Sequence, residues 1–299
     1  MTEYDTLFNK QIVAQIITDA ARDTIGFAKF FPKIPLEEQT NYYSYFKPEL
    51  TWEEAKKKGK LGRARKIAEG AEFQPIKIRD YETKTEAFGL VGGKFTLTED
   101  QMTTAPLQSV EYLKESGKLI MEEVNIEFLK FYDKIAEIEY NQTTTDDMMQ
   151  YLIKAQGKVK NADIDLFCTD SEGYTQGRLY LLEKGLPLTP VPEIKTYFKV
   201  ANIQFQDLAL AKGGRGFDTL QVKGIDINDP GIQIMYSPRR GTTQAPVSDE
   251  DDAFAPLMNV KADDTRMKQD PAKMDWFIST QYFFLGMNPE NLFKGKFKA

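Results

Sequence analysis

The sequence predicts an α+β fold in which long strands accompany one long helix. Residues 73–97 alternate in polarity as a half-exposed ribbon does. Residues 105–140 carry a stripe of apolar or small residues at helical spacing: Leu107, Val110, Leu113, Gly117, Ile120, Val124, Phe128, Phe131, Ile135 and Ile138. Residues 185–260 are short strand-like segments separated by proline and glycine. The 299 residues suffice for two domains or one large elaborated domain, and no internal repeat or flexible linker interrupts them.

The composition excludes several classes of protein. An aromatic content of 12% excludes a largely disordered chain, and a net charge of −6 disfavours attraction of the whole protein to nucleic acid. Because histidine is absent, Ser-His-Asp and Cys-His mechanisms are excluded, together with most zinc and haem sites. The single cysteine, Cys168, lies in an apolar run, which predicts a buried inert thiol and a reducing folding compartment. No apolar run approaches the roughly 18 residues of a membrane span, and the acidic start is unlike a signal peptide, so we expect folding in the cytoplasm.

The first segment is expected to be an arm with an amphipathic helix over residues 7–22. Pro32 and Pro35 end any helix before them. The apolar face of this arm needs another surface to cover it, and its members are Phe8, Ile12, Ile16, Phe27, Phe30 and Phe31.

An extended loop follows. An aromatic strand over 39–47 and the ribbon over 73–97 flank a basic segment, with Lys56, Lys57, Lys58, Lys60, Arg63, Arg65 and Lys66. Three interpretations stay open for this cluster: solvated charge, binding of nucleic acid, or pairing with acidic surface on a neighbouring subunit. The acidic remainder of the chain favours the third interpretation, because identical subunits are then complementary.

The long helix begins with a capping box. Thr98 is the predicted cap and Gln101 reaches back to it, while Pro106 stands in the first turn or separates a short leading helix. Further along we expect helices over 146–156 and 171–184 and strands over 163–169, 232–236 and 276–285.

Three short motifs resemble metal-binding or phosphate-binding sites, but a solvated loop or a turn explains each of them better. Asp249–Asp252 is an acidic run of the kind that is usually solvated. The stretch from Asp226 to Gly231 resembles a calcium loop, but Pro230 occupies a ligand position. Gly213–Gly216 lacks the Lys-Ser/Thr of a phosphate-binding loop. We therefore predict no catalytic residue, no metal and no cofactor; an enzyme dependent on Asp226, Asp229 or 249–252 remains the remote alternative.

The order of these elements resembles the tailed-phage major capsid protein, whose fold is shared with encapsulins and the herpesvirus capsid floor. The resemblance rests on Ile67–Pro75, the ribbon 81–88, the segment 95–100, the strand 163–169 with its following helix, and the ending 286–290. It implies a phage major capsid fold with an N-terminal arm (1–38), an extended β-hairpin loop (39–97), a peripheral domain with a long spine helix (98–160), an axial domain with a central mixed sheet (161–260) and closing C-terminal strands (261–299).

The resemblance also implies a function. The chain is expected to assemble with itself, as hexamers and pentamers, into the icosahedral shell of a virion around double-stranded DNA that it touches only non-specifically, in the host cytoplasm and without a membrane. The extended-loop cations and the arm residues named above are then inter-subunit contacts, and scaffold, portal and decoration proteins are further partners. An encapsulin-like compartment is the alternative. Some relatives join an extended-loop lysine to a neighbour's asparagine, which draws attention to Lys56–Lys60, Asn288 and Asn291.

Overall fold

The structure is a computed structural model of the whole chain. It describes residues 8–22, 24, 26–36, 41–48, 52–58, 81–141, 148–159, 164, 166–169, 179, 183, 189–190, 197–200, 203–207, 221–226, 228–245, 257–268 and 272–296. Within these ranges, no helix has the length and apolar character that crossing a membrane requires. The predicted helix 171–184 and the motifs Gly213–Gly216 and Asp249–Asp252 lie almost entirely outside the described residues.

The chain forms two compact units. The larger combines Met1–Gln39 with Gly89–Ala299, and the smaller is Thr40–Phe88. The predicted extended segment 39–97 is therefore divided, because residues after Phe88 join a sheet of the larger unit. The remaining domain boundaries stay a prediction.

The first sheet of the larger unit is organised around one long strand, β13 (Lys273–Gly286). One edge of β13 pairs antiparallel with β4 (Gly89–Thr98), and its other edge pairs with β12 (Asn259–Asp263) and then β11 (Ile232–Tyr236). Strand β1 (Lys33–Pro35) runs parallel to β11. The predicted strands 232–236 and 276–285 are confirmed as β11 and β13.

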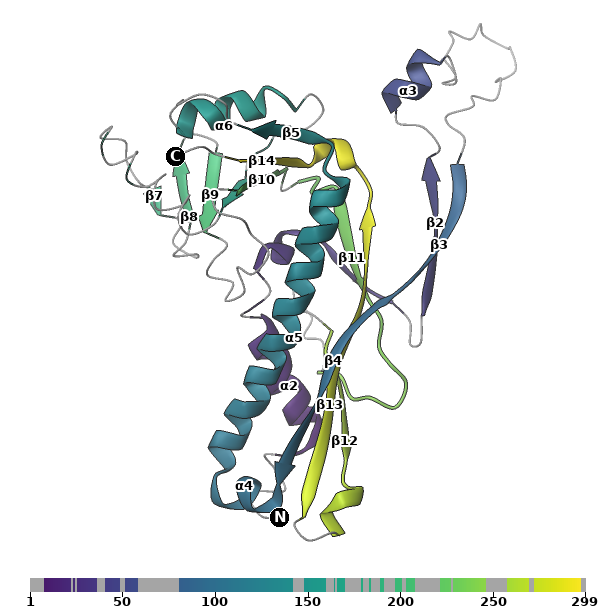
Figure 1. The fold of residues 1–299 in the computed structure, drawn as a ribbon, viewed down its shortest axis with the longest axis vertical. Coiled ribbons are helices and arrows are strands. Elements are labelled where there is room, and N and C mark those ends of the chain that lie inside the picture. Colours follow the sequence, from purple (N-terminus) through teal and green to yellow (C-terminus); the bar gives the residue numbers. More distant parts are fainter. Residues whose placement is uncertain are drawn as a thin grey trace, which may run out of the picture. The chain divides into compact units, whose positions relative to one another are not determined.

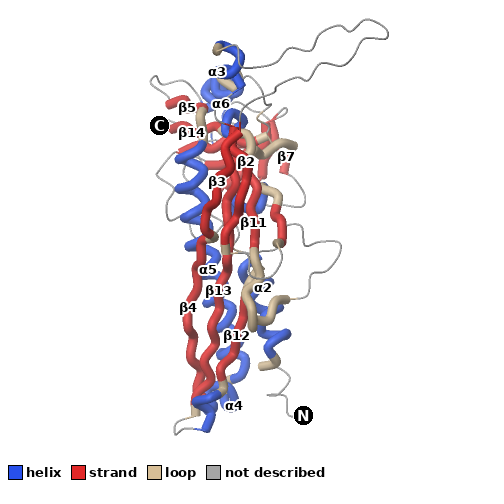
Figure 2. Tube along the Cα trace, turned by 90° about the vertical axis from the view of Figure 1, so that its right-hand side faces the viewer, coloured by secondary structure: helices blue, strands red, loops and turns tan. Residues whose placement is uncertain are grey.

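Two helices cover one face of this sheet (Figures 1 and 2). The capping box forms as predicted: Thr98 caps α4 (Glu99–Thr104), and Pro106 starts α5 (Pro106–Ile135). Helix α5 lies along β4 and β13, and α2 (Lys10–Arg22) packs beside it. The 3-10 helix η1 (Gly26–Phe30) follows α2 and also contacts α5.

The apolar stripe of α5 differs from the predicted one at both ends. Leu107, in the first turn of α5, is 74% exposed. Ile138 belongs to the strand β5 (Ile138–Asn141), since the helix ends at Ile135 and Ala136 is extended. Between these ends the predicted positions Val110, Leu113, Gly117, Ile120, Val124 and Phe128 are buried.

Among the described residues, the second sheet is mixed and has seven strands, two of which, β5 and β14, lie outside the predicted axial range 161–260. Its order is β5, β14, β10, β6, β9, β8, β7, with parallel pairs β14–β5 and β6–β9 and antiparallel pairs elsewhere. The remaining bounds are β6 Leu166–Thr169, β7 Thr189–Pro190, β8 Tyr197–Val200, β9 Ile203–Asp207, β10 Gln221–Ile225 and β14 Phe293–Lys296. Helix α6 (Met148–Gln156) and two 3-10 turns, η3 (Thr265–Lys268) and η4 (Pro289–Asn291), complete the larger unit.

The described part of the smaller unit is a two-stranded antiparallel ribbon with a short helix. Strand β2 (Tyr42–Pro48) pairs along its whole length with β3 (Tyr81–Ala87), and α3 (Trp52–Lys57) follows β2. The ribbon confirms the predicted pairing of the aromatic strand with the alternating one.

Candidate assembly surfaces

The N-terminal helix is held by close approach to the long helix. A Cβ placed on Gly117 of α5 would lie 2.9 Å from both Cγ2 and the carbonyl oxygen of Ile17 in α2, so only glycine allows this approach. The buried face of α2 is accordingly built from small and medium residues, among them Ala14, Ile17 and Ala21. Asn125 of α5 donates a hydrogen bond of 2.7 Å to the carbonyl of Thr24, just after α2.

Aromatic rings tie the segment after α2 to the same helix. The ring centroid of Phe128 lies 5.9 Å from that of Phe27 and 4.8 Å from that of Phe31. The ring centroids of Phe27 and Tyr132 are 5.2 Å apart. All four side chains are at most 3% exposed. Edge-on aromatic pairs at such distances add to the free energy of burial.

These contacts locate the six arm residues singled out from the sequence. Phe8, Phe27 and Phe31 are buried in the core of their own chain, Ile16 and Phe30 are partly buried, and Ile12 is 37% exposed. The face of α2 that packs on α5 is therefore turned from the predicted Phe8–Ile12–Ile16 stripe toward Val13, Ala14 and Ile17. The expected contact of this set with a neighbouring subunit stays a prediction.

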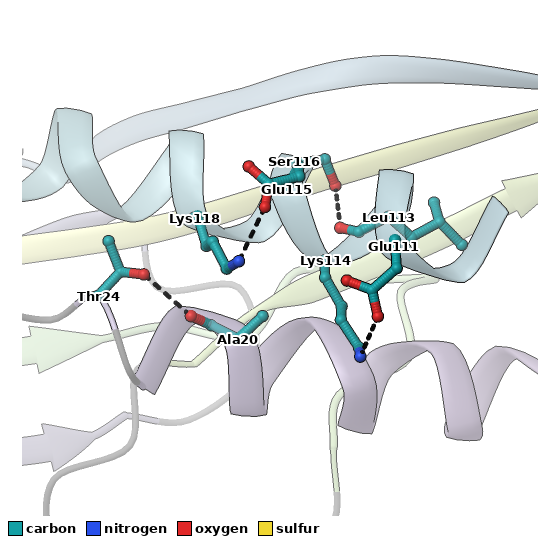
Figure 3. Close-up of polar contacts among 8 residues, drawn as sticks. All are labelled: Ala20, Thr24, Glu111, Leu113, Lys114, Glu115, Ser116 and Lys118. Atoms are coloured by element: carbon teal, nitrogen blue, oxygen red, sulfur yellow. Dashed lines mark hydrogen bonds and ion pairs between the residues drawn. The ribbon is translucent and has the colours of Figure 1, made fainter. Parts of the chain in front are cut away.

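Helix α5 carries ion pairs along its more accessible side. Figure 3 shows the i,i+3 pairs Glu111–Lys114 at 2.6 Å and Glu115–Lys118 at 2.8 Å, together with the hydrogen bond that Thr24 donates to the carbonyl of Ala20. Such exposed pairs contribute little to stability and keep a helix face soluble. Tyr112 and Leu119 interrupt this charged side and are 47% and 57% exposed.

The ribbon of the smaller unit has two chemically different faces. Tyr45 donates a hydrogen bond of 2.9 Å to Glu86 and stacks near Tyr43, with ring centroids 6.4 Å apart. Partial burial, with help from Glu86, raises the pKa of Tyr45 to about 12. On the opposite face Tyr42 and Phe46 are 68% and 75% exposed.

The basic segment is only partly within the described residues. Lys56 and Lys57 end α3 and Lys58 follows; all three are exposed, and among the described residues no ion pair joins them. The other four predicted contact residues lie outside the described residues: Lys60, Arg63, Arg65 and Lys66. The inter-subunit role of the seven cations stays a prediction.

Sheet β4–β13–β12 also presents an accessible face, opposite α5. Lys94 of β4 forms an ion pair of 2.8 Å with Asp275 of β13, which also accepts a hydrogen bond of 2.6 Å from Thr96. The Lys94 ammonium lies 5.6 Å from the ring centroid of Phe277, which is 38% exposed. Leu90 of the same strand is 53% exposed, so this face carries apolar groups beside a satisfied charge pair.

Two titratable side chains, Cys168 and Lys223, are buried in the interior of the larger unit. Burial raises the pKa of the Cys168 thiol, as expected for an inert cysteine, although nearby Lys29 and Lys223 act in the opposite direction. Lys223 of β10 is 1% exposed; it pairs with Asp133 of α5 and lies 5.2 Å from the ring centroid of Tyr132.

The residues suggested for carboxylate chemistry have structural partners. Asp226 accepts hydrogen bonds from the backbone N–H groups of Asn228 and Asp229. Asp229 accepts hydrogen bonds from the side-chain amides of Asn288, at 3.0 and 3.2 Å, and Asn291, at 2.9 Å. This cluster joins the turn before β11 to the turn after β13. Its two asparagines, Asn288 and Asn291, are the ones that the sequence analysis named as possible cross-linking residues.

Metal-ligating side chains do not gather among the described residues. Within them, no three His, Cys, Asp or Glu side chains gather as a metal site requires. A surface pocket of about 290 Å³ lies between the β4 end and the α4–α5 corner, where its described lining is neutral: Thr96, Leu97, Gln101, Ala105, Gln108, Ser109 and Tyr112.

The sequence analysis missed the exposed aromatics of the ribbon. It identified the alternation of β3 and the aromatic character of β2, but it did not combine them into two faces. The signal was present, because Tyr42 and Phe46 are four positions apart in one strand and therefore share a side.

The comparisons with known proteins come from structure alone, since no family model and no curated protein sequence matches this chain. A virus-like particle subunit from Pyrococcus furiosus superposes with a TM-score of 0.56 and 9% identity, over 95% of this chain and 97% of that one. An encapsulin from Synechococcus elongatus gives 0.57 and 9%, over 90% and 85%, and the capsid of cyanophage P-SCSP1u gives 0.53 and 8%, over 90% and 87%. The chain therefore has, along nearly its whole length, the fold that tailed-phage capsids share with encapsulins.

Proposed function

We propose that this chain is the subunit of a closed protein shell, and specifically the major capsid protein of a virus with double-stranded DNA. The observation that carries the proposal is the similarity of fold over nine-tenths or more of the chain to proteins described as a capsid and a virus-like particle. The ribbon unit adds support, because Thr40–Phe88 forms a separate compact unit that exposes aromatic and basic side chains.

Assembly in this proposal depends on packing and charge. The α5–sheet layer makes a rigid body, the ribbon and its basic segment reach an adjacent subunit, and the mixed sheet supplies the part that meets its copies around five-fold and six-fold axes. Several further points belong to this proposal: the domain boundaries given above other than the end of the extended loop at residue 97, scaffold, portal and decoration partners, assembly in the host cytoplasm and non-specific contact with enclosed DNA. An acidic protein suits that role, because it tolerates DNA without holding it.

The second candidate is an encapsulin-like compartment. The similarity to the Synechococcus elongatus encapsulin favours it, with a TM-score as high as that of the virus-like particle. The two functions differ in content: a capsid encloses nuclease-protected DNA, whereas a compartment encloses protein.

Microscopy and sedimentation of the purified full chain test the proposal. We expect regular closed particles, tubes, or rings of five and six subunits, by negative-stain electron microscopy and sedimentation velocity. A stable monomer or dimer that persists when scaffold protein is supplied contradicts the shell function. Nuclease treatment followed by extraction of the particles then distinguishes DNA from protein cargo.

Charge reversal tests the role of the basic segment. We expect the triple variant K56E/K57E/K58E to weaken or abolish assembly while the monomer stays folded, because these exposed lysines contribute nothing to a core. The triple variant K56R/K57R/K58R keeps the charge and serves as the matched control. Normal shells from the glutamate variant would exclude a role for these three cations.

A further inference from the structure

We propose that the ribbon β2–β3 docks on a second copy of this chain through the face that carries Tyr42 and Phe46, and that the face of Tyr43 and Tyr45 is turned to solvent. This inference rests on the proposed function and adds to it which side of the ribbon is buried at the contact.

The Tyr42–Phe46 face is apolar and free of charge. Tyr42 stands opposite Ala87, and Phe46 stands opposite Thr83. Between them Ser44 and Thr85 satisfy each other through a hydroxyl hydrogen bond of 2.7 Å. Two aromatic side chains that are 68% and 75% exposed on such a neutral surface are typical of an interaction site.

On the opposite face, polar and charged side chains already pair with one another within the ribbon. Glu82 pairs with Lys84 at 3.1 Å, and Glu86 accepts the hydrogen bond of Tyr45. Burying these groups would remove ionised side chains from water without offering them better partners, and this costs free energy. The charge distribution therefore selects the Tyr42–Phe46 face for burial.

The ribbon needs a cover to be stable. An isolated two-stranded ribbon is marginally stable in water, because it buries too little apolar surface to offset the conformational entropy that the chain loses on folding. The contact that stabilises it therefore has to bury the face on which apolar area is still available.

Charge complementarity identifies the cover as a second copy. Residues 56–66, which lie between β2 and β3 in the sequence, hold seven basic residues and no acidic one, which leaves 32 basic against 45 acidic residues in the rest of the chain. A basic segment on one copy and an acidic remainder on the next attract each other, and the same pairing repeats around a symmetric assembly.

Site-specific photo-crosslinking tests which face is buried. The photoreactive amino acid p-benzoylphenylalanine replaces Phe46 in one variant and Tyr43 in the matched control, and assembled particles of each are irradiated. We expect the yield of covalently joined chains to be severalfold higher from position 46 than from position 43. Equal yields, a higher yield from position 43, or no joined chains from either position overturns the proposal.

Removal of the apolar side chains gives a second, independent measurement. The double variant Y42S/F46S should raise the chain concentration needed for assembly by about tenfold or more, whereas Y43S leaves it near the wild-type value. Circular dichroism and sedimentation of the unassembled chains check that both variants fold. An unchanged threshold for Y42S/F46S overturns the docking face but leaves the shell function standing; failure of the unmodified chain to assemble overturns both.

Discussion

Gly117 lies where α5 closely approaches α2, and the structure leaves no room there for a side chain. In the interior of a helix alanine is favoured over glycine by about 1 kcal/mol. Here a Cβ meets the backbone carbonyl of Ile17 at 2.9 Å, so the two helices have to separate.

We therefore expect Gly117→Ala to destabilise the folded chain by about 1–3 kcal/mol, although alanine has the higher helix propensity. The measurement is the midpoint of denaturant unfolding, together with proteolysis of the N-terminal segment. Gly157→Ala is the matched control, because its Cβ would find the nearest atom at 3.5 Å. If Gly117→Ala stabilises the chain as the control does, the close approach is wrong.

Lys33 gives the stability a defined dependence on pH. Burial lowers its pKa from 10.5 to about 7. Between these pH values the unfolded chain binds a proton at Lys33 that the folded chain lacks, so the free energy of unfolding rises with pH across this window. The penalty for burying the ammonium is complete below pH 7 and is relieved as pH rises toward 10.5.

Replacing Lys33 by methionine removes this titration. We expect the stability of wild type relative to Lys33→Met to increase from pH 7 to pH 10, by at most about 1.4 kcal/mol per pH unit. Thermal or denaturant unfolding at several pH values measures it. Lys134→Met, at an exposed position of α5, controls for the loss of a lysine as such. A difference between wild type and Lys33→Met that does not change with pH would contradict the burial of Lys33.

At the scale of elements, α5 joins the two sheets of the larger unit. Near its C-terminal end the Tyr132 hydroxyl lies 2.9 Å from the carbonyl oxygens of Gly224 in β10 and Phe293 in β14. Asp133, the next residue, pairs with Lys223 of β10. One turn of α5 thus satisfies buried polar groups of two strands that are distant in sequence.

Removing the Tyr132 hydroxyl should loosen this junction. We expect Tyr132→Phe to lower the free energy of unfolding by about 1–2 kcal/mol, because buried carbonyls lose a donor and the ring packing is unchanged. Tyr112→Phe on the same helix, at a side chain that is 47% exposed, should be nearly neutral. Equal effects of the two substitutions, measured by denaturant unfolding, would show that the hydroxyl contributes nothing specific.

At the scale of the whole molecule, the separation of basic and acidic residues should make assembly sensitive to salt. The Debye length falls from about 10 Å at 0.1 M ionic strength to about 3 Å at 1 M. We expect the rate of particle formation, followed by light scattering, to fall as salt rises. The arginine control K56R/K57R/K58R should keep this dependence and any residual assembly of K56E/K57E/K58E should lose it; a faster rate of wild-type assembly at high salt would contradict the charge pairing.

Much of the local structure could be predicted from sequence because short-range rules decide it. The capping box at Thr98, the entry of α5 at Pro106, the alternation along β3 and the aromatic strand β13 all follow from side-chain type and spacing. The α+β class and the likeness to the capsid fold followed from the order of these elements.

Tertiary structure alone decided which face each element buries and where the segments join. The buried face of α2 is turned from the predicted stripe toward Val13, Ala14 and Ile17, because Ile17 packs against Gly117 of α5, a contact that the sequence of α2 does not contain. Strand β14 was missed, because Phe293–Lys296 is too short and too polar to signal a strand and gains its order from pairing with β5 and β10. The sequence by itself thus determined the longer helices and strands, their order and the charge of the extended loop, since these depend on neighbouring residues. Only the folded chain decided that Phe27 and Phe31 belong to its own core while Tyr42 and Phe46 remain exposed, since burial depends on partners far away in the sequence.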